Sequence, residues 1–195
     1  MLFLARTGSA APAAKMNTAK KSAFNQQLWI GGGVKLPTGK FDVGFDEIEA
    51  LTADVNSQQG SGSLDFLLNS SYNIRKNNFG VNTTVNYKIN TSNRDNYAFG
   101  NRFSASSLAY YSIKMKDVFL APNSGIIYDN AAGNKFQSIK INQTGGYAAY
   151  AVAGAELSMK SITIGANAQL PFTQNFSDGQ TKAKFRGMMH ASFSF

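Results

Sequence analysis

Ionisable side chains recur at every second position in part of this sequence, the spacing of one face of a β-strand. In residues 182 to 195 the polar positions carry Lys182, Lys184, Arg186 and His190, and apolar residues alternate with them. His190 is the only histidine, so a catalytic role would be that of a general base for a serine nucleophile. A lone histidine on a polar strand face is weak support for that chemistry. We therefore expect neither enzymatic activity nor a cofactor.

Other alternating segments carry isolated charges on their polar positions. The full set of candidate lumen-lining residues is Asp65, Lys88, Arg102, Glu156, Lys182, Lys184, Arg186 and His190. Because cations outnumber carboxylates, an interior lined by them would be wet, mildly cationic and favourable to anionic or polar solutes. The alternative is a salt-bridged polar plug that fills a small barrel, and the sequence leaves both open.

A separate acidic cluster lies in residues 37 to 60. Its members are Asp42, Asp46, Glu47, Glu49 and Asp54. With Lys40 as the one cation, this segment has a net charge of −4, so the rest of the +8 chain carries +12. A divalent cation or a cationic ligand could bind here, but the spacing matches no calcium-binding loop. We expect a solvated acidic loop and no bound metal.

The composition restricts the fold that positions these groups. The chain has 195 residues, only 15% charged residues and no cysteine, which excludes disulfides and thiolate metal sites. It is rich in Asn, Ser and Gly, which disfavour helix. No apolar run reaches the 18 or so residues of a membrane-spanning helix. A membrane β-barrel remains open, because only every second residue of its strands faces lipid.

Period-two alternation covers most of the chain. In residues 61 to 74 most even positions are apolar, and in residues 79 to 90 most odd positions are, with a turn at 75 to 78 between them. Further strands are predicted at 24 to 36, 97 to 111, 118 to 128, 144 to 157, 161 to 172 and 182 to 195. A change of phase between Phe103 and Leu108 predicts a bulge near Ser106 and Ser107. We therefore expect an all-β, antiparallel up-and-down transmembrane β-barrel with eight strands over residues 24 to 195.

Loop lengths and aromatic positions support this topology. Connections 37 to 60, 91 to 96, 129 to 143 and 173 to 181 are mostly longer than those between them, as extracellular loops are longer than periplasmic turns. Aromatic residues near strand ends predict two girdles at headgroup level. The outer girdle would hold Phe66, Tyr87, Tyr97, Phe99, Tyr128, Phe172 and Phe185, and the inner one Phe24, Tyr72, Phe79, Tyr110, Phe193 and Phe195.

The last predicted strand ends on Phe195 with aromatic residues on its apolar face. Such a strand resembles the signal that outer-membrane barrels present to the barrel assembly machinery, which would make that machinery a partner alongside outer-membrane lipid. We expect no nucleic-acid partner, because the face opposite the basic residues is continuously apolar and no recognition motif occurs.

Several segments together resemble one family over about residues 24 to 195. They are GGGVKLPTGKFD from residue 31, QGSGSLDF at 59 to 66, TGGY at 144 to 147, QLPFTQNFSDGQT at 169 to 181 and the HASFSF ending. The chain is similar to the outer-membrane proteins of the phenol-degradation meta-pathway (MetA-pathway) type, described as transporters. The resemblance implies an outer-membrane β-barrel of a Gram-negative bacterium that passes hydrophobic or aromatic small molecules. It supplies no catalytic or binding residues for these positions.

Residues 1 to 23 do not read as an export signal, because no cation precedes the short apolar segment MLFLA. We expect a poorly structured or remnant segment here, and an amino-terminally truncated product of a longer barrel protein. The predicted function is passive passage of small molecules. The alternative is a structural or adhesive outer-membrane barrel that acts through its extracellular loops, and a soluble lipocalin-like barrel would instead place its apolar residues inside.

Overall fold

The computed structural model describes residues 24 to 39, 41 and 58 to 193, and these residues form an antiparallel sheet of eight long strands. The long strands are β1 (Asn25–Lys35), β2 (Asp65–Lys76), β3 (Phe79–Ile89), β5 (Arg102–Tyr111), β7 (Val118–Ala131), β10 (Gly146–Met159), β11 (Ile162–Phe176) and β12 (Arg186–Phe193). Each pairs with the next along the chain, so the sheet is a simple meander. The predicted all-β, antiparallel up-and-down fold with eight strands is confirmed.

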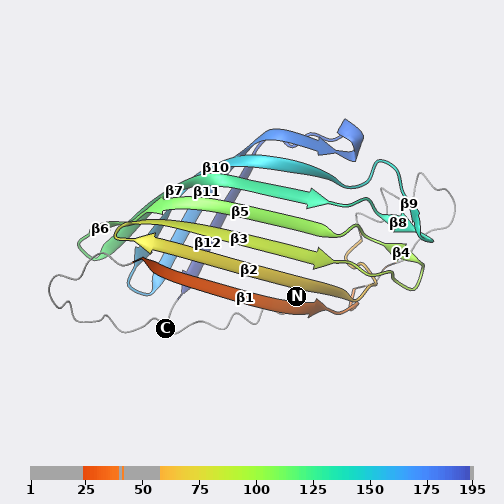
Figure 1. The fold of residues 1–195 in the computed structure, drawn as a ribbon, viewed down its shortest axis with the longest axis horizontal. Coiled ribbons are helices and arrows are strands. Elements are labelled where there is room, and N and C mark those ends of the chain that lie inside the picture. The colour runs from red at the N-terminus through yellow and green to blue at the C-terminus, as the bar shows by residue number, and fades with distance from the viewer. Residues whose placement is uncertain (1–23, 40, 42–57, 194–195) are drawn as a thin grey trace.

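The sheet curls into a half-barrel. In Figure 1, β1, β2, β3, β5, β7 and β10 form the near wall, and β11 and β12 pass behind it. Among the described residues β1 and β12 each pair on one side only, so the two edges of the sheet are not joined to each other. In the same part of the chain no helix is long and apolar enough to cross a membrane.

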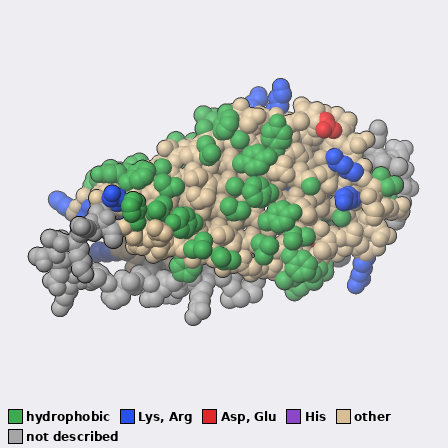
Figure 2. Space-filling model, in the orientation of Figure 1, with side chains coloured by type: hydrophobic (Ala, Val, Ile, Leu, Met, Phe, Trp, Pro, Cys, Tyr) green, Lys and Arg blue, Asp and Glu red, His purple; other side chains and the backbone are tan. Residues whose placement is uncertain are grey.

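Register assigns every strand residue to one of two faces, because residues opposite each other in an antiparallel pair point the same way. Leu28 pairs with Tyr72, and Leu68 with Tyr87, which places these apolar side chains together on the convex face. Figure 2 shows apolar side chains spread over the near, convex side of the sheet. Ile30 and Met189, on the two edge strands, are 79% and 80% exposed.

The described part of the chain lacks the extensive buried hydrophobic core that soluble proteins have. Only five hydrophobic residues there are buried, against 31 large hydrophobic residues that are exposed. The convex face accounts for much of this exposed set, including Leu28, Ile30, Val34, Phe66, Leu68, Tyr72, Val85, Ile126, Leu157, Ile164, Leu170, Met189 and Phe193.

The predicted bulge near Ser106 and Ser107 is wrong. Both residues lie in unbroken register with β3 and β7. The change of phase instead arises because one residue on each face breaks the alternation. The polar Ser107 lies on the apolar convex face, where its hydroxyl is 3.2 Å from that of Thr83, and the apolar Leu108 points to the polar concave side. A register shift does occur between Ala149 and Tyr150, where β11 contributes Phe172 as an extra residue beside Pro171.

The final strand is shorter than predicted. It begins at Arg186, and residues 182 to 185 form no strand, so Lys182 and Lys184 do not belong to the strand face to which the sequence assigned them. Thr181 forms an isolated bridge with Phe176, and Gln174 exchanges two hydrogen bonds with the backbone of Ala183. Contacts back to β11 therefore hold this segment. Phe195 lies outside the described residues.

At one end of the sheet the connections are tight turns. β2 joins β3 through Asn77 and Asn78, and β6 (Ile113–Met115), which follows β5, joins β7 through Lys116 and Asp117. Asn77, Lys116 and Lys160 have φ of 54°, 51° and 50°, the left-handed values that reverse a strand within two residues.

At the other end, the connections after β3 and β7 fold against each other. β4 (Tyr97–Ala98), β8 (Lys135–Phe136) and β9 (Ile139–Lys140) form a small sheet. Tyr97 is fully buried there, its hydroxyl accepts a hydrogen bond of 2.8 Å from Asn134 Nδ2, and burial raises the pKa of this phenol. Tyr97 and Phe99 pack with Phe41, Phe136 and Ile141.

Two parts of the aromatic-girdle prediction are therefore wrong. Tyr97 and Phe99 belong to this packed cluster rather than to an outward ring. Tyr110 lies on the concave side, where its hydroxyl and the side-chain amide of Asn73 are 3.2 Å apart. Phe66, Tyr72, Tyr87 and Tyr128 are exposed.

The open edges can be tested by cross-linking, since the chain contains no cysteine. We expect Ile30→Cys combined with Met189→Cys to give no intrachain cross-link with a short bismaleimide, because β1 and β12 are unpaired with each other. Leu28→Cys and Val34→Cys, each combined with Met189→Cys, cover other registers of the same edge. Gel mobility under denaturing conditions and mass spectrometry of linked peptides provide the measurement.

The matched control is Ile30→Cys with Ser70→Cys, which face each other across β1 and β2 and should link efficiently. Efficient intrachain linkage between β1 and β12 would show that the eight strands close on themselves.

Candidate functional site

The concave face holds nearly all of the strand charge. The eight long strands contain nine Lys, Arg, Asp and Glu residues, and eight of them point to this side. These eight are Lys35, Asp65, Arg75, Lys88, Arg102, Asp129, Glu156 and Arg186. The ninth, Lys76, is the last residue of β2, next to a turn. Five cations and three carboxylates give the concave face a net charge of +2.

Of the predicted lumen-lining residues, the structure places Asp65, Lys88, Arg102, Glu156, Arg186 and His190 on this concave face. Lys182 and Lys184 lie in the segment before β12. The acidic cluster, Asp42, Asp46, Glu47, Glu49 and Asp54, lies outside the described residues. Within the described part of the chain no three His, Cys, Asp or Glu residues gather as a potential metal site.

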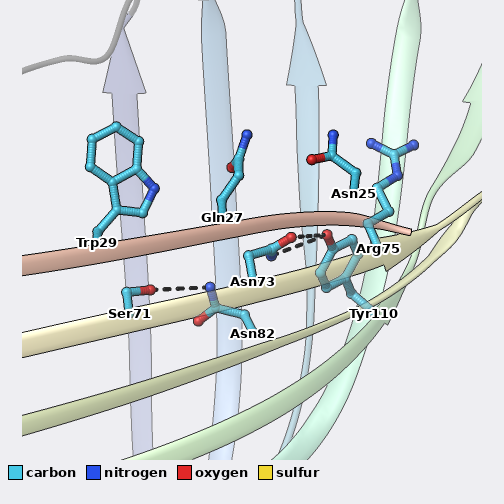
Figure 3. A pocket seen from close by; sticks show the side chains of 8 residues that line it. All are labelled: Asn25, Gln27, Trp29, Ser71, Asn73, Arg75, Asn82 and Tyr110. Carbon is cyan, nitrogen blue, oxygen red and sulfur yellow. Dashed lines mark hydrogen bonds between the residues drawn. The ribbon is translucent and has the colours of Figure 1, made fainter. Parts of the chain in front are cut away.

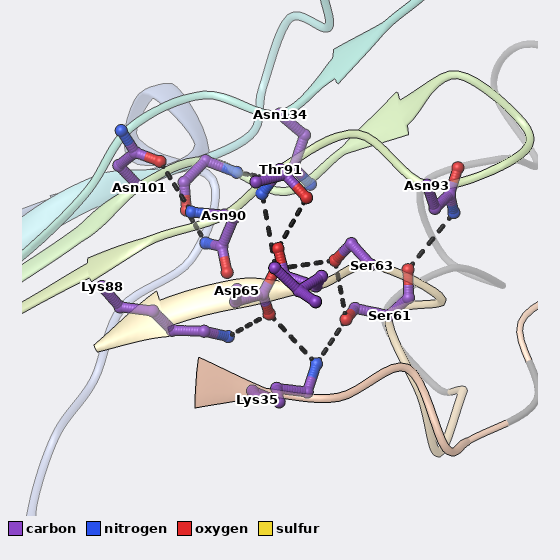
Figure 4. A network of polar contacts seen from close by, with 12 residues as sticks. Lys35, Ser61, Ser63, Asp65, Lys88, Asn90, Thr91, Asn93, Asn101 and Asn134 are labelled. Carbon is purple, nitrogen blue, oxygen red and sulfur yellow. Dashed lines mark hydrogen bonds and ion pairs between the residues drawn. The ribbon is translucent and has the colours of Figure 1, made fainter. Parts of the chain in front are cut away.

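Asp65 is the centre of a polar network at the ends of β1, β2 and β3 (Figure 4). Its side chain is fully buried, and Oδ2 lies 3.2 Å from Lys35 Nζ and 3.1 Å from Lys88 Nζ. Oδ1 accepts hydrogen bonds of 2.7 Å from Ser63 Oγ and 3.4 Å from the backbone N–H of Thr91. A buried carboxylate is costly unless it is paired, and four donors on three strands and their flanking segments meet that requirement.

The same network reaches the segments beyond the strand ends. Lys35 also donates to Ser61 Oγ, and Asn93 Nδ2 donates to the Ser61 carbonyl at 3.2 Å. Asn90 extends these contacts toward β5. Its backbone N–H donates to Asn101 Oδ1 at 2.9 Å, and the Nδ2 of Asn90 donates to the Gly100 carbonyl at 2.6 Å. These contacts tie the ends of β1, β2 and β3 to the segment that precedes β5.

Arg186 forms a second network across the width of the sheet. Its Nη2 lies 3.0 Å from Asp129 Oδ2, and its Nε donates to Gln169 Oε1 at 2.6 Å. The guanidinium lies 4.3 Å from the centre of the Tyr150 ring. Since β10 and β11 separate β12 from β7, a flat sheet would put those two strands about 14 Å apart, three spacings of roughly 4.8 Å. Curvature on this side brings the two side chains together.

A weaker contact links β10 and β12 further along. His190 Nε2 lies 3.7 Å from Glu156 Oε1 across Gly165, and both side chains are close to half exposed. This distance exceeds that of a hydrogen bond. No serine hydroxyl is hydrogen-bonded to His190 in the described part of the chain.

Two hollows open on the concave side. One, of about 320 Å³, lies toward the tight turns between β1, β2, β3 and β5. It is lined by the polar side chains Asn25, Gln27, Ser71, Asn73, Arg75 and Asn82, together with Trp29 and Tyr110 (Figure 3). The other, of about 500 Å³, lies toward the opposite end and includes Arg102, Asp129, Tyr150 and Arg186.

Several residues of these networks are absent from the sequence-based set, among them Lys35, Gln169, Asp129 and Tyr150. Lys35 and Gln169 lie on the polar positions of predicted strands, so the alternation of polar and apolar residues is enough to predict that both face the concave side. Asp129 was missed because the predicted strand stops at residue 128, whereas β7 continues to Ala131. Tyr150 is aromatic and faces the concave side, where period-two hydrophobicity predicts a polar residue.

Comparisons of the chain with protein-family models, with curated proteins and with solved structures find no match.

Replacing Asp65 tests the first network. Asp65→Asn keeps the size of the side chain but removes the negative charge that lies between the ammonium groups of Lys35 and Lys88. We therefore expect the free energy of unfolding to fall by about 1 to 3 kcal/mol. Reversible urea unfolding measures this loss. The control is Asp117→Asn, which removes an exposed turn carboxylate and should change stability by less than about 0.5 kcal/mol. Equal effects of the two variants would contradict the assigned role.

Proposed function

We propose that this chain forms a β-barrel in the outer membrane of a Gram-negative bacterium and lets small molecules pass along its polar concave side. The observation that carries the proposal is the separation of the faces: eight of the nine charges on the long strands point to the concave side, and the convex side is mostly apolar. A soluble barrel or sandwich would bury the apolar side. Here the apolar side chains are exposed over the length of the strands.

Contact with lipid explains the convex face. A Lys or Arg facing lipid costs roughly 2 to 4 kcal/mol near the bilayer midplane and about 0 to 1 kcal/mol near its surface. Lys76, the one outward charge on the long strands, stands at a strand end, where that cost is small. The tight turns and the folded connections would then lie at the two membrane surfaces.

The curvature favours passage over a filled interior. Eight strands that close on themselves leave an interior just filled by side chains. Here eight strands span half a barrel, so a closed barrel of this curvature has more strands and a wider lumen. The two hollows of about 320 and 500 Å³ support open space over the alternative of a salt-bridged plug.

A membrane location requires pairing partners for the two edge strands, β1 and β12. Backbone N–H and C=O groups left unpaired in hydrocarbon cost several kcal/mol each, and open sheet edges do not occur there. Further strands must therefore pair with β1 and β12 in the membrane, and the same pairing would enclose the lumen.

The resemblance to the meta-pathway outer-membrane proteins supports the same location, and it extends the proposal to aromatic or hydrophobic solutes. The barrel assembly machinery remains a proposed partner for the carboxy-terminal strand, with lipid as the partner of the convex face.

Membrane location can be tested with two neighbouring residues of β2. Leu68 lies on the convex face, and Asn69 lies on the concave face opposite Gly31. We expect Leu68→Lys to destabilise the protein folded in lipid vesicles by about 2 to 4 kcal/mol. Asn69→Lys, the matched control, should fold nearly as well as the parent. Urea unfolding in vesicles and heat-modifiable gel mobility measure both, and equal tolerance of the two lysines would argue against lipid contact.

Passage can be tested by reconstitution. We expect vesicles containing the folded protein to take up small sugars in a swelling assay, at a rate that falls with solute mass, and planar bilayers to show discrete conductance. Vesicles with heat-denatured protein are the control. Insertion without uptake or conductance would reject passage and favour the structural or adhesive barrel.

A further inference from the structure

The larger of the two hollows on the concave side is the one lined by Arg102, Asp129, Tyr150 and Arg186. It lies on the concave side near the packed connections, between β5, β7 and β10, with Thr144 to Gly146 and Phe176 on its border. The backbone N–H of Ser177 donates to the Gly145 carbonyl at 3.0 Å, which joins these two border segments. Its volume of about 500 Å³ is in the range of small-molecule sites.

The charges around it do not cancel. Asp129 is the carboxylate in its lining, and both of its oxygens are engaged: Oδ1 accepts from Ser104 at 2.7 Å, and Oδ2 is paired with Arg186. Arg102 also lines the hollow, is exposed, and makes no hydrogen bond or ion pair within the described part of the chain.

The neighbouring charge strengthens this excess. Arg102 lies directly opposite Lys88 across β3 and β5, and Lys88 already shares Asp65 with Lys35. At this end of the concave face four cations, Lys35, Lys88, Arg102 and Arg186, therefore face two carboxylates, a net charge of +2. A guanidinium without a partner in such a setting favours a planar, bidentate anion.

The second arginine is held in place rather than free. Arg186 is fixed by Asp129, Gln169 and the face of Tyr150, and its side chain is still 46% exposed. Tyr150, Phe99 and Phe176 add aromatic surface to the lining. The hollow thus combines one uncommitted guanidinium, a second that is already oriented, and apolar rings.

We infer that this hollow binds a small organic anion, with its carboxylate on Arg102 and its apolar part against the aromatic side chains. The inference rests on the proposed function, because it treats the concave side as the path of a solute, and it names the class of solute that the path selects.

Ligand-observed fluorine NMR on the folded protein in detergent micelles can test the inference. The probe is 4-fluorobenzoate, and its neutral counterpart 4-fluorobenzamide reports binding that does not need the anion. We expect saturable binding of the benzoate, with an affinity at least about tenfold higher than that of the amide. Arg102→Gln should weaken benzoate binding by about tenfold or more, and Arg102→Lys should restore part of it.

Arg94→Gln is the matched control, because Arg94 is an exposed arginine in the connection before β5 and does not line the hollow. It should leave benzoate binding unchanged. Heat-modifiable mobility checks that each variant is folded. The inference is overturned if the benzoate does not bind, if the amide binds equally well, or if Arg102→Gln and Arg94→Gln have equal effects.

Vesicle uptake separates this inference from the proposed function. Uptake of neutral sugars without benzoate binding would leave passage standing and reject the anion site. Arg102-dependent benzoate binding with no uptake of any solute would support the site and reject passage.

Discussion

The structure depends on the two-residue period of the β-strand, which gives one sheet two surfaces with opposite requirements. Each strand alternates between a convex residue and a concave one, and pairing in register keeps that division across all eight strands. A one-residue slip anywhere would move a whole strand's charges to the apolar side. The charges on Lys35, Asp65, Lys88 and Arg186 therefore specify register as well as providing local contacts.

Polar networks are possible on the concave side because curvature shortens distances between strands that do not pair. Arg186 reaches Asp129 across two intervening strands, and Asp65 connects β1, β2 and β3 at their ends. The Arg186–Asp129 pair is partly exposed and adds modestly to stability, whereas Asp65 is buried and depends on its partners. The larger effect of these pairs is positional, because they fix cations at defined places on the concave surface. Among the five described strand cations of this face, Arg102 is the one without a hydrogen bond or ion pair.

The sequence was sufficient for the strands and much of the site, because alternation is a local signal. It identified Asp65, Lys88, Arg102, Glu156, Arg186 and His190 on the face where they lie. It failed where tertiary contacts decide: Tyr97 is buried by residues distant in sequence, such as Phe41 and Phe136, and Tyr110 turns inward to Asn73. The supposed bulge at Ser106 shows that a change of hydrophobic phase can arise from side chains alone. Lys182 and Lys184 keep the alternation but lie in a segment that pairs only by isolated contacts, which periodicity does not detect.

The meander has a consequence for how the sheet can assemble. Every strand pairs with its neighbour in sequence, and tight turns at Asn77, Lys116 and Lys160 join three of the hairpins. Short chain closures cost little entropy and form quickly, so the sheet can grow hairpin by hairpin in either direction. The pairings that close over longer connections, such as residues 36 to 64 between β1 and β2, lack this help, and any slow step in folding is expected there.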